Sequence, residues 1–358
     1  MEALNLCELW YMGKHPTKSK DDLVFSLQGP AGSGKTTLAK KIAEGKKVLY
    51  GAYTGKAASV LRKSGCIGAS TIHSLIYDSF VDEHGKFHVS RKVHSPIQNV
   101  DLVIIDESSM VDEEIGKDLL SYGKKILFLG DNNQLKPPEG MGFLRDLPVD
   151  FQLTEIHRQA QNSPVLKLAN EVLSGNYIPH GQYGDSLVTS GIDDAMFLSH
   201  DITIVGKNDT KKALNSHIRG LKGFVTKYPA VGDKIICLKN DKNLGLYNGM
   251  ICDVRKVNQP RRQNFLHLSV SPEDNPKHVV GVEIHLSFFN DSIPMPYFKS
   301  LFGTQHFDYA YAITAHKSQG SQWEKVLIID ESAVFRDEKK NWMYTAITRA
   351  SKSITLVK

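Results

Sequence analysis

The sequence predicts an α/β protein with two parallel-sheet domains, a β-hairpin inserted in the first domain and a small β-barrel inserted in the second. Apolar strand-like segments alternate with helical segments over about residues 20–150, which is typical of a doubly wound parallel sheet. The same alternation begins again near residue 202. A run of short strands with Gly, Asn and Pro breaks then interrupts it, which favours an inserted barrel.

The first domain, expected over residues 1–150, is built from strand segments that end in polar residues. These segments are LVFSLQ (23–28), KVLYGAYT (47–54), DLVIID (101–106) and KILFLGD (125–131). The helical segments TLAKKIAEG and GKAASVLRKSG follow the first two strands. Between the second and third strands, YDSFVDEHGKFHVSRKV alternates on either side of the turn signal His84-Gly85. We interpret about residues 76–94 as a β-hairpin that projects from the domain.

The second domain, expected over residues 151–358, starts its α/β pattern at ITIVGKN (202–208) and resumes it at DYAYAITAHKSQG. The intervening strands are VGDKIICLKN, GMICDVRKVN, FLHLSVS and HVVGVEIHLSFF. Their short length and their Gly, Asn and Pro breaks predict a small barrel over about residues 235–300.

The composition is that of an ordinary globular chain, with 41% hydrophobic and 23% charged residues. The sequence contains no run of 18 apolar residues and no signal-peptide pattern, so we expect a cytoplasmic protein without a membrane partner. The four cysteines form no CxxC pair and indicate reduced thiols rather than a zinc site or disulfides. A net charge of +5 permits a polyanionic partner without demonstrating one.

The strongest motif is the phosphate-binding loop GPAGSGKT, residues 29–36, which lies between a strand and a helix. Its backbone N–H groups and the start of the helix suit a nucleotide's phosphates. We expect Lys35 to reach the β- and γ-phosphates and the Thr36 hydroxyl to hold magnesium. The expected nucleotide-binding residues of this loop are Gly29, Pro30, Ala31, Gly32, Ser33, Gly34, Lys35, Thr36 and Thr37.

The tetrapeptide Ile-Asp-Glu-Ser occurs twice after an apolar strand. Asp106-Glu107 lies on a later strand of the sheet that carries the phosphate loop, so Asp106 is a candidate magnesium ligand and Glu107 a candidate general base. Gln134, after a further strand, is placed to touch the γ-phosphate and the attacking water. Asp330-Glu331 has no phosphate loop in its own domain, so we expect these carboxylates to face solvent or to cap the next helix.

Phosphoryl transfer also needs positive charge on the γ-phosphate, often from an arginine outside the loop's own domain. Arg158 in LTEIHRQ and Arg349 in MYTAITRA are the two candidates.

These motifs occur in the order GPAGSGKTT, AYTGKAASVL, STIHSL, VIIDESSM, FLGDNNQLKP, LTEIHRQ, YAITAHKSQGSQW and MYTAITRA. The series resembles the motif set of superfamily 1 helicases over roughly residues 25–358. TGKAA, TIHS and AITAHKSQG most resemble the RecD-like branch of that superfamily. VGDKIICLKNDKNLGLYNGM (231–250) resembles the stretch that leads into the branch's SH3-like barrel.

The resemblance implies two RecA-like domains that bind ATP and Mg²⁺ and close on the nucleotide. It implies that Arg158 and Arg349 act on the γ-phosphate and that Gly320, after HKSQ, belongs to the nucleotide site. It also implies an ATP-dependent helicase that moves 5′ to 3′ on single-stranded DNA and unwinds forked duplex. We expect a monomer, with replication or recombination proteins as further partners.

Polar residues at the ends of predicted strands form the expected polynucleotide track, because ligands bind at this edge of open α/β sheets. Hydroxyl, imidazole and ammonium groups suit contacts with phosphate and sugar rather than with bases. In the related branch the hairpin serves as a pin that splits the duplex, and an apolar residue at its tip stacks on the fork. The expected DNA-binding residues are Thr54, Lys56, Thr71, His73, Phe87, Thr314, His316 and Lys317.

One feature departs from the family pattern. The family usually has a glutamine upstream of the phosphate loop that hydrogen-bonds adenine, but here no glutamine precedes Gln28, which sits on the strand itself. The sequence therefore leaves nucleotide selectivity open. Two other functions stay open as well. One is an RNA-directed superfamily 1 NTPase of the viral replication type, and the other is a non-catalytic subunit that only binds nucleic acid.

Overall fold

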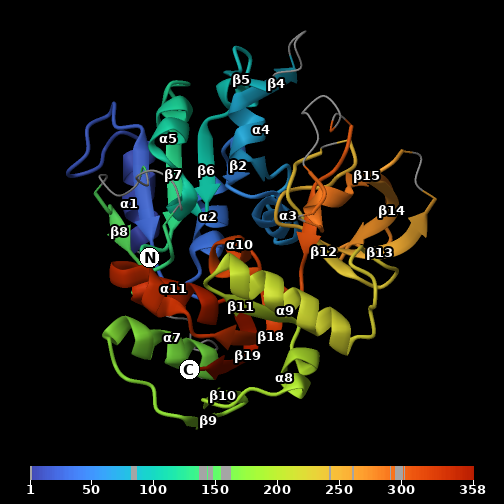
Figure 1. Ribbon diagram of the computed structural model, residues 1–358. Helices are drawn as coiled ribbons and strands as arrows, with labels where there is room; N and C mark the ends of the chain where they lie inside the picture. Colours follow the sequence, from blue (N-terminus) through green and yellow to red (C-terminus); the bar gives the residue numbers. More distant parts are fainter. Residues whose placement is uncertain are drawn as a thin grey trace. The chain divides into compact units, whose positions relative to one another are not determined.

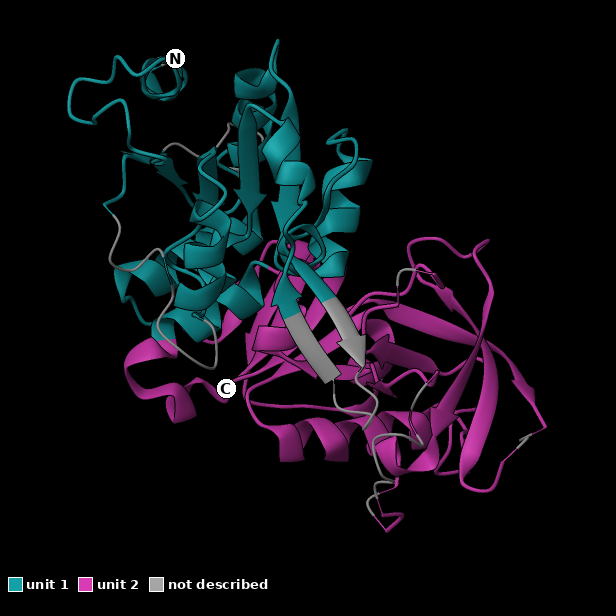
Figure 2. Ribbon diagram, turned by 90° about the horizontal axis from the view of Figure 1, so that it is seen from above, with its two compact units in different colours: residues 1–80, 88–177, 340–348 teal, residues 81–87, 178–339, 349–358 magenta. Residues whose placement is uncertain are grey.

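The structure is a computed structural model that describes residues 2–81, 87–136, 143, 148–154, 163–241, 243–259, 262–290, 292–294, 301 and 303–358. The chain divides into two compact units, shown in different colours in Figure 2. The first unit comprises residues 1–80, 88–177 and 340–348. The second comprises residues 81–87, 178–339 and 349–358. Within the described part of the chain, no helix combines the length and the apolar character needed to span a membrane.

The first unit contains a parallel sheet with the strand order β3-β2-β6-β7-β1-β8. Its strands are β1 (Val24–Gln28), β2 (Val48–Ala52), β3 (Ser70–Thr71), β6 (Leu102–Asp106), β7 (Lys125–Gly130) and β8 (Phe151–Gln152). Because all of these strands are parallel, their carboxyl ends lie at one edge of the sheet, where ligands of such sheets bind. The parallel α/β sheet expected for this part of the chain is confirmed.

Helices cover both faces of this sheet (Figure 1). The covering helices are α1 (Glu2–Tyr11), α2 (Lys35–Ala43), α3 (Gly55–Lys63), α4 (Ile72–Ile76) and α5 (Glu113–Leu120). The first unit also contains α7 (Pro164–Ser174) and most of α11 (Lys339–Ile347). Side chains alternate between the faces along a strand. On β6, Leu102 and Ile104 join the buried cluster that contains Trp10 of α1, whereas Val103 and Ile105 join the cluster of α4 and α5. The apolar strands are therefore buried on both sides.

The units differ from the expected division at residue 150. Residues 151–177 group with the first unit, partly because β8 extends its sheet through the pairing of Leu27 with Phe151. Residues 340–348 also group with it, because α11 hydrogen-bonds to the loops that follow β1 and β7. The motif MYTAITRA is consequently divided, with helix α11 in the first unit and Arg349 in the second.

The second unit contains a sheet with the order β17-β11-β18-β19-β10-β9, in which only the β10–β9 pairing is antiparallel among the described strands. These strands are β9 (Gly181–Tyr183), β10 (Ser186–Thr189), β11 (Ile202–Val205), β17 (Ala312–Thr314), β18 (Trp323–Ile329) and β19 (Ala350–Val357). The accompanying helices are α8 (Asp194–Ser199), α9 (Asn208–Leu221) and α10 (Ala315–Ser318).

An antiparallel sheet with the order β15-β14-β13-β12-β16 is inserted between α9 and β17. Its strands are β12 (Lys234–Cys237), β13 (Ile251–Asn258), β14 (Phe265–Pro272), β15 (Val280–His285) and β16 (Phe307–Tyr309). The insertion therefore continues beyond the expected limit near residue 300. DYAYA looked like the return to the second parallel sheet, but Tyr309 pairs antiparallel with Ile235 of β12.

The segment expected to form a hairpin contains β4 (Tyr77–Val81) and β5 (Phe87–Arg91), which form a two-stranded sheet. Residues 82–86, between these strands, lie outside the described part of the chain.

Candidate active site

The phosphate loop connects the end of β1 to the start of α2. Gly34 precedes the helix with φ of 81°, a left-handed conformation that glycine adopts without steric cost. Gly29 is required for space, because a Cβ there would lie 2.7 Å from Ser33 Oγ and 2.8 Å from Leu153 Cβ. The sequence thus forms a tight loop that directs backbone N–H groups and the helix start to one place, as an anion site requires.

The lysine of this loop is held by the loop's own backbone. Lys35 Nζ donates to the carbonyl oxygens of Gly29 at 2.6 Å and Pro30 at 3.0 Å. The Ser33 hydroxyl is buried, and its oxygen has no hydrogen-bond partner. A polar ligand is therefore needed to satisfy a hydroxyl that packing has taken from water. This observation fits a nucleotide phosphate at the loop.

The two predicted magnesium ligands lie together. Thr36 Oγ1 donates to Asp106 Oδ2 at 3.4 Å, bringing a hydroxyl and a carboxylate to one point. Desolvation and the charge of Glu107 raise the pKa of Asp106 to about 6, while hydrogen bonds and Lys35 act in the opposite direction. Hydroxyl and carboxylate oxygens are ligands that Mg²⁺ accepts, so these residues fit the ion expected from the motif.

Glu107 follows Asp106 with φ of 53° and ψ of 43°. A non-glycine residue in the left-handed region carries strain, and such strain concentrates at functional sites. The turn is stabilised by a hydrogen bond from Glu107 N to Asp106 Oδ1 at 2.9 Å. It turns the chain directly after the strand, so the two adjacent carboxylates do not continue along the sheet.

Gln134 lies in the loop after β7, which begins at Asp131. Gln134 is 5% exposed, its N–H donates to Asp131 O at 3.0 Å, and its Oε1 has no hydrogen-bond partner. Gln28 is also buried, and its Nε2 donates to Ser26 Oγ at 2.9 Å within the sheet. Gln28 therefore lies within the sheet rather than upstream of it, and the buried Oε1 atoms of Gln28 and Gln134 both lack a hydrogen-bond partner.

Helix α11 contacts this site through residues that sequence reasoning did not select. The Tyr344 hydroxyl accepts from Ala31 N at 3.0 Å and donates to Asp131 Oδ2 at 2.7 Å. Thr345 Oγ1 accepts from Leu135 N at 2.8 Å, and Asn341 Nδ2 donates to Asn133 O at 3.0 Å. The available signal was Tyr344 itself, a polar aromatic residue inside the matched motif MYTAITRA.

The second Asp-Glu pair has a structural role. Glu331 Oε2 accepts hydrogen bonds from the N–H groups of Gly206 at 2.8 Å and Lys207 at 2.9 Å. Its Oε1 accepts from the Thr210 hydroxyl at 2.6 Å. Burial alone would raise the pKa of Glu331, but these hydrogen bonds lower it below its usual value. Glu331 therefore caps the start of α9, which precedes it in the chain, and not the next helix as expected.

The two candidate arginines differ in what the structure describes. Arg349 is 5% exposed, and its Nη1 donates to Ser321 O at 3.3 Å within the second unit. Ser321 follows Gly320, the remaining predicted nucleotide-binding residue. Arg158 lies outside the described residues, so its predicted role is unchanged.

In the first unit, the predicted DNA-binding residues lie beyond adjacent strand ends. Ala52 of β2 pairs with Thr71 of β3, and Thr54 and His73 follow these two residues. The oxygen of Thr54 caps α3 by accepting from Ala57 N, and that of Thr71 caps α4 by accepting from Ser74 N. Capping uses the oxygen as an acceptor and leaves the hydroxyl hydrogen to donate elsewhere. Lys56 is half-buried in α3.

In the second unit, Thr314 caps α10 by accepting from Lys317 N. The exposed Lys317 reaches Asn248 Oδ1 with its Nζ at 3.3 Å, while half-buried His316 packs against Phe335. Phe87 begins β5, but its side chain lies outside the described part. The predicted DNA-binding residues thus remain predictions, with three threonines already serving as caps.

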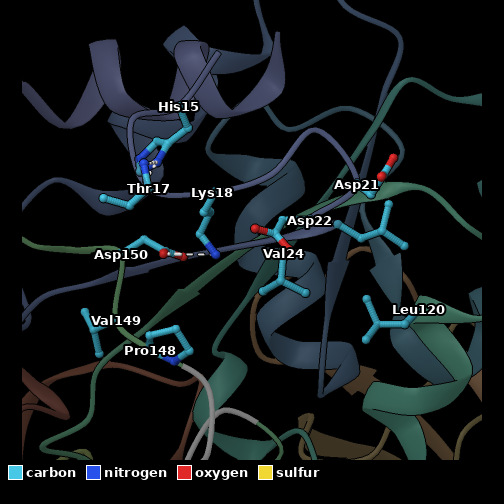
Figure 3. A pocket seen from close by; sticks show the side chains of 11 residues that line it. His15, Thr17, Lys18, Asp21, Asp22, Val24, Leu120, Pro148, Val149 and Asp150 are labelled. Atoms are coloured by element: carbon cyan, nitrogen blue, oxygen red, sulfur yellow. Dashed lines mark hydrogen bonds and ion pairs between the residues drawn. The ribbon is translucent and has the colours of Figure 1, made fainter. Parts of the chain in front are cut away.

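A separate cavity of about 620 Å³ lies at the opposite end of β1 (Figure 3). Its lining includes His15, Lys18, Val24 and Asp150. Lys18 Nζ lies 3.0 Å from Asp150 Oδ1, and Asp150 Oδ2 accepts from the Ser26 N–H at 2.8 Å. This ion pair fixes the edge of the sheet, and the phosphate loop lies at the other end of the strand.

Comparison with known proteins reveals relatives of both parts of the chain. The family described as AAA domain matches residues 14–182, and the UvrD-like helicase C-terminal domain matches residues 309–357. The ATP-dependent RecD2 DNA helicase of Deinococcus radiodurans is 28% identical and aligns with 90% of this chain. The ATP-dependent DNA helicase dda of phage T4 is 33% identical over 42% of this chain. The chain is thus similar to RecD-like helicases of superfamily 1, in agreement with the resemblance of its motifs.

Solved structures extend the similarity to the fold. A Pif1 helicase studied at forked double-stranded DNA covers 99% of the chain and 90% of its own, with a TM-score of 0.61 and 19% identity. A Bacteroides Pif1 helicase with ADP-AlF3 and single-stranded DNA has a TM-score of 0.59 and 18% identity, covering 99% of this chain and 92% of its own. The matches span less than half the length of these two curated relatives, 45% of RecD2 and 38% of dda.

Proposed function

We propose that this chain is an ATP-dependent DNA helicase that moves along single-stranded DNA and unwinds duplex. The observation that supports the proposal is the hydrogen bond between Thr36 and Asp106 next to the loop that carries Lys35, at the carboxyl edge of a parallel sheet. The similarity to RecD2 and dda, both named as ATP-dependent DNA helicases, supports it.

In this proposal the chain's residues perform phosphoryl transfer to water. Lys35 leaves the carbonyl oxygens of Gly29 and Pro30 and binds the β- and γ-phosphate oxygens. Glu107 orients the attacking water and accepts its proton, and Gln134 hydrogen-bonds the same water. Arg349 stabilises the charge that develops on the γ-phosphate, and Arg158 has the same proposed role.

Thr36 and Asp106 would hold Mg²⁺, which would neutralise phosphate charge when bound. Residues that would bind the strand are Thr54, Lys56, Thr71, His73, Thr314, His316 and Lys317, which contact backbone rather than bases. A translocating enzyme needs such contacts, because base-specific contacts would favour one sequence and stop its movement.

The finer features follow the family pattern. We infer 5′-to-3′ movement driven by closure of two RecA-like domains, with the β4–β5 hairpin as the pin and the inserted antiparallel sheet as an SH3-like barrel. We further propose that the protein acts as a monomer on single-stranded and forked DNA, with replication or recombination proteins as partners.

Unwinding of tailed duplexes tests this function. Duplexes with a 5′ or a 3′ overhang, each supplied with ATP, GTP, CTP or UTP and Mg²⁺, report activity, direction and nucleotide selectivity together. We expect ATP-dependent unwinding of the 5′-tailed DNA. Stimulation of ATP hydrolysis by single-stranded RNA but not by DNA would instead favour the RNA-directed alternative, and binding without hydrolysis would favour the non-catalytic one.

A further inference from the structure

The Tyr344 hydroxyl joins the phosphate loop to the loop that carries Gln134. It accepts from the Ala31 N–H at 3.0 Å and donates to the carboxylate of Asp131 at 2.7 Å. Tyr344 is 1% exposed and Asp131 2% exposed, so neither group exchanges these bonds for water. Buried hydrogen bonds to a charged group are strong and directional, and each loop is therefore held in a fixed position relative to the other.

The link continues along the Gln134 loop. Asp131 Oδ1 accepts from Asn133 N at 3.1 Å, and Asp131 O accepts from Gln134 N at 3.0 Å. The same helix holds this loop at a second place, through Asn341 Nδ2 to Asn133 O at 3.0 Å. A shift of Ala31 as the loop opens for phosphate would accordingly pass through Tyr344 to Asp131 and to the backbone of Gln134.

We propose that Tyr344 is a positioning residue for ATP hydrolysis. Its hydrogen bonds fix the position of Gln134 relative to the phosphate loop. The inference rests on the proposed function, because it assigns Gln134 to the attacking water. Tyr344 does not touch the nucleotide in this proposal and acts through the two loops. Loss of the Tyr344 hydroxyl should misplace Gln134 and leave the phosphate-binding groups of residues 29–36 in place. Small misplacements at a reacting centre strongly lower the rate of the chemical step, here ATP hydrolysis.

The test is the Tyr344→Phe variant, which removes one hydroxyl and keeps the ring. With saturating single-stranded DNA, we expect kcat for ATP hydrolysis to fall about tenfold or more, with KM for ATP and the Kd of ADP within about twofold of wild type. The control is Tyr122→Phe, because the Tyr122 hydroxyl likewise joins two segments of the first unit, with its single hydrogen shared between Lys92 O at 2.8 Å and Ile76 O at 3.2 Å. The control should keep the wild-type kcat and show a similar loss of thermal stability.

A double-mutant cycle separates positioning from general destabilisation. In a Gln134→Ala background, Tyr344→Phe should change kcat less than twofold, because the group it positions is already absent. Multiplicative losses in the double variant, or a wild-type kcat in Tyr344→Phe, would overturn the inference. If Tyr344→Phe fails to fold, Asn341→Ala replaces it as the test, because Asn341 is half-buried at the start of the same helix. Asn341→Ala should then lower kcat and keep KM for ATP. A wild-type kcat in Asn341→Ala would count against the inference. Absence of ATP hydrolysis by the wild-type protein would instead refute the proposed function itself.

Discussion

Glu331 Oε2 accepts a hydrogen bond from Gly206 N at 2.8 Å, so the second Asp-Glu pair of this chain is a helix cap. The first pair has a different environment, although the local sequence is the same. Glu107 is half-buried in a left-handed turn beside Asp106, in the sheet that carries the phosphate loop. The same residues thus lie in two different environments, and the same substitution can be made at both glutamates to compare their roles.

Glu107→Gln should abolish ATP turnover and keep nucleotide binding, because glutamine cannot accept the proton of the attacking water. Glu331→Gln should keep kcat near wild type and cost about 1–2 kcal/mol of stability, because the carboxylate cap of α9 is lost. Steady-state ATPase assays, ADP binding and thermal denaturation measure these effects. Equal losses of kcat in both variants would contradict the assignment of the first pair as the catalytic one.

The sequence predicted much of this arrangement because its signals are local. Strand segments 101–106 and 125–131 are apolar runs that end in carboxylates, and the loop 29–36 fits a phosphate motif with the correct flanking elements. The parallel sheet, the loop and the neighbourhood of Thr36 and Asp106 follow from such patterns. The extent of the inserted sheet could not be predicted from such patterns. Strand β16 is only three residues long, and it is identified by its pairing with β12 rather than by its own sequence.

Arg349→Ala should lower kcat by about 10³-fold and leave nucleotide binding largely intact, since the guanidinium is proposed to act on charge that develops during transfer. Arg349→Lys should recover little of the rate, because an ammonium group does not reproduce the planar fork of arginine. Single-turnover ATP hydrolysis and ADP binding distinguish the two effects. A variant with weak binding and a normal single-turnover rate would remove the proposed role.

The contacts of α11 show what sequence patterns cannot supply. Tyr344 and Asp131 are separated by more than 200 residues, and each lies in a motif that was interpreted by itself. Their hydrogen bond depends on how a helix near the end of the chain packs on the first sheet, which no local periodicity encodes. By contrast, Thr54 and Thr314, expected as DNA contacts, also cap helices through local contacts with the N–H groups three residues later.

Affinity for single-stranded DNA should fall as salt rises, because phosphate contacts release counterions. Lys317→Ala should reduce the slope of log K against log salt by about 0.7, the value expected for one phosphate contact on a single strand. Lys352→Ala is the matched control, since Lys352 is exposed in the same unit and pairs with Glu324 at 2.6 Å. Fluorescence anisotropy over a salt series measures both, and an unchanged slope for Lys317→Ala would exclude this contact.

The inserted sheet should make stability depend on pH through His306. The ring of His306 is half-buried against Phe288, with centroids 4.4 Å apart, and its Nε2 has no hydrogen-bond partner. Desolvation and then the charge of Lys239 lower the pKa of His306 to about 4. A histidine in the unfolded chain has a pKa near 6.5, so between these values the unfolded state binds more protons.

This contribution to stability is therefore complete above about pH 6.5 and is lost as the pH falls from 6.5 toward 4. Between pH 7.5 and 5.0, wild type should lose about 2 kcal/mol more of its unfolding free energy than His306→Phe, which keeps a ring against Phe288 but cannot be protonated. Urea denaturation at the two pH values measures the difference. His180→Phe, at an exposed position, is the control and should retain the wild-type pH dependence of the unfolding free energy. If His306→Phe also retained this pH dependence, His306 would not be its source.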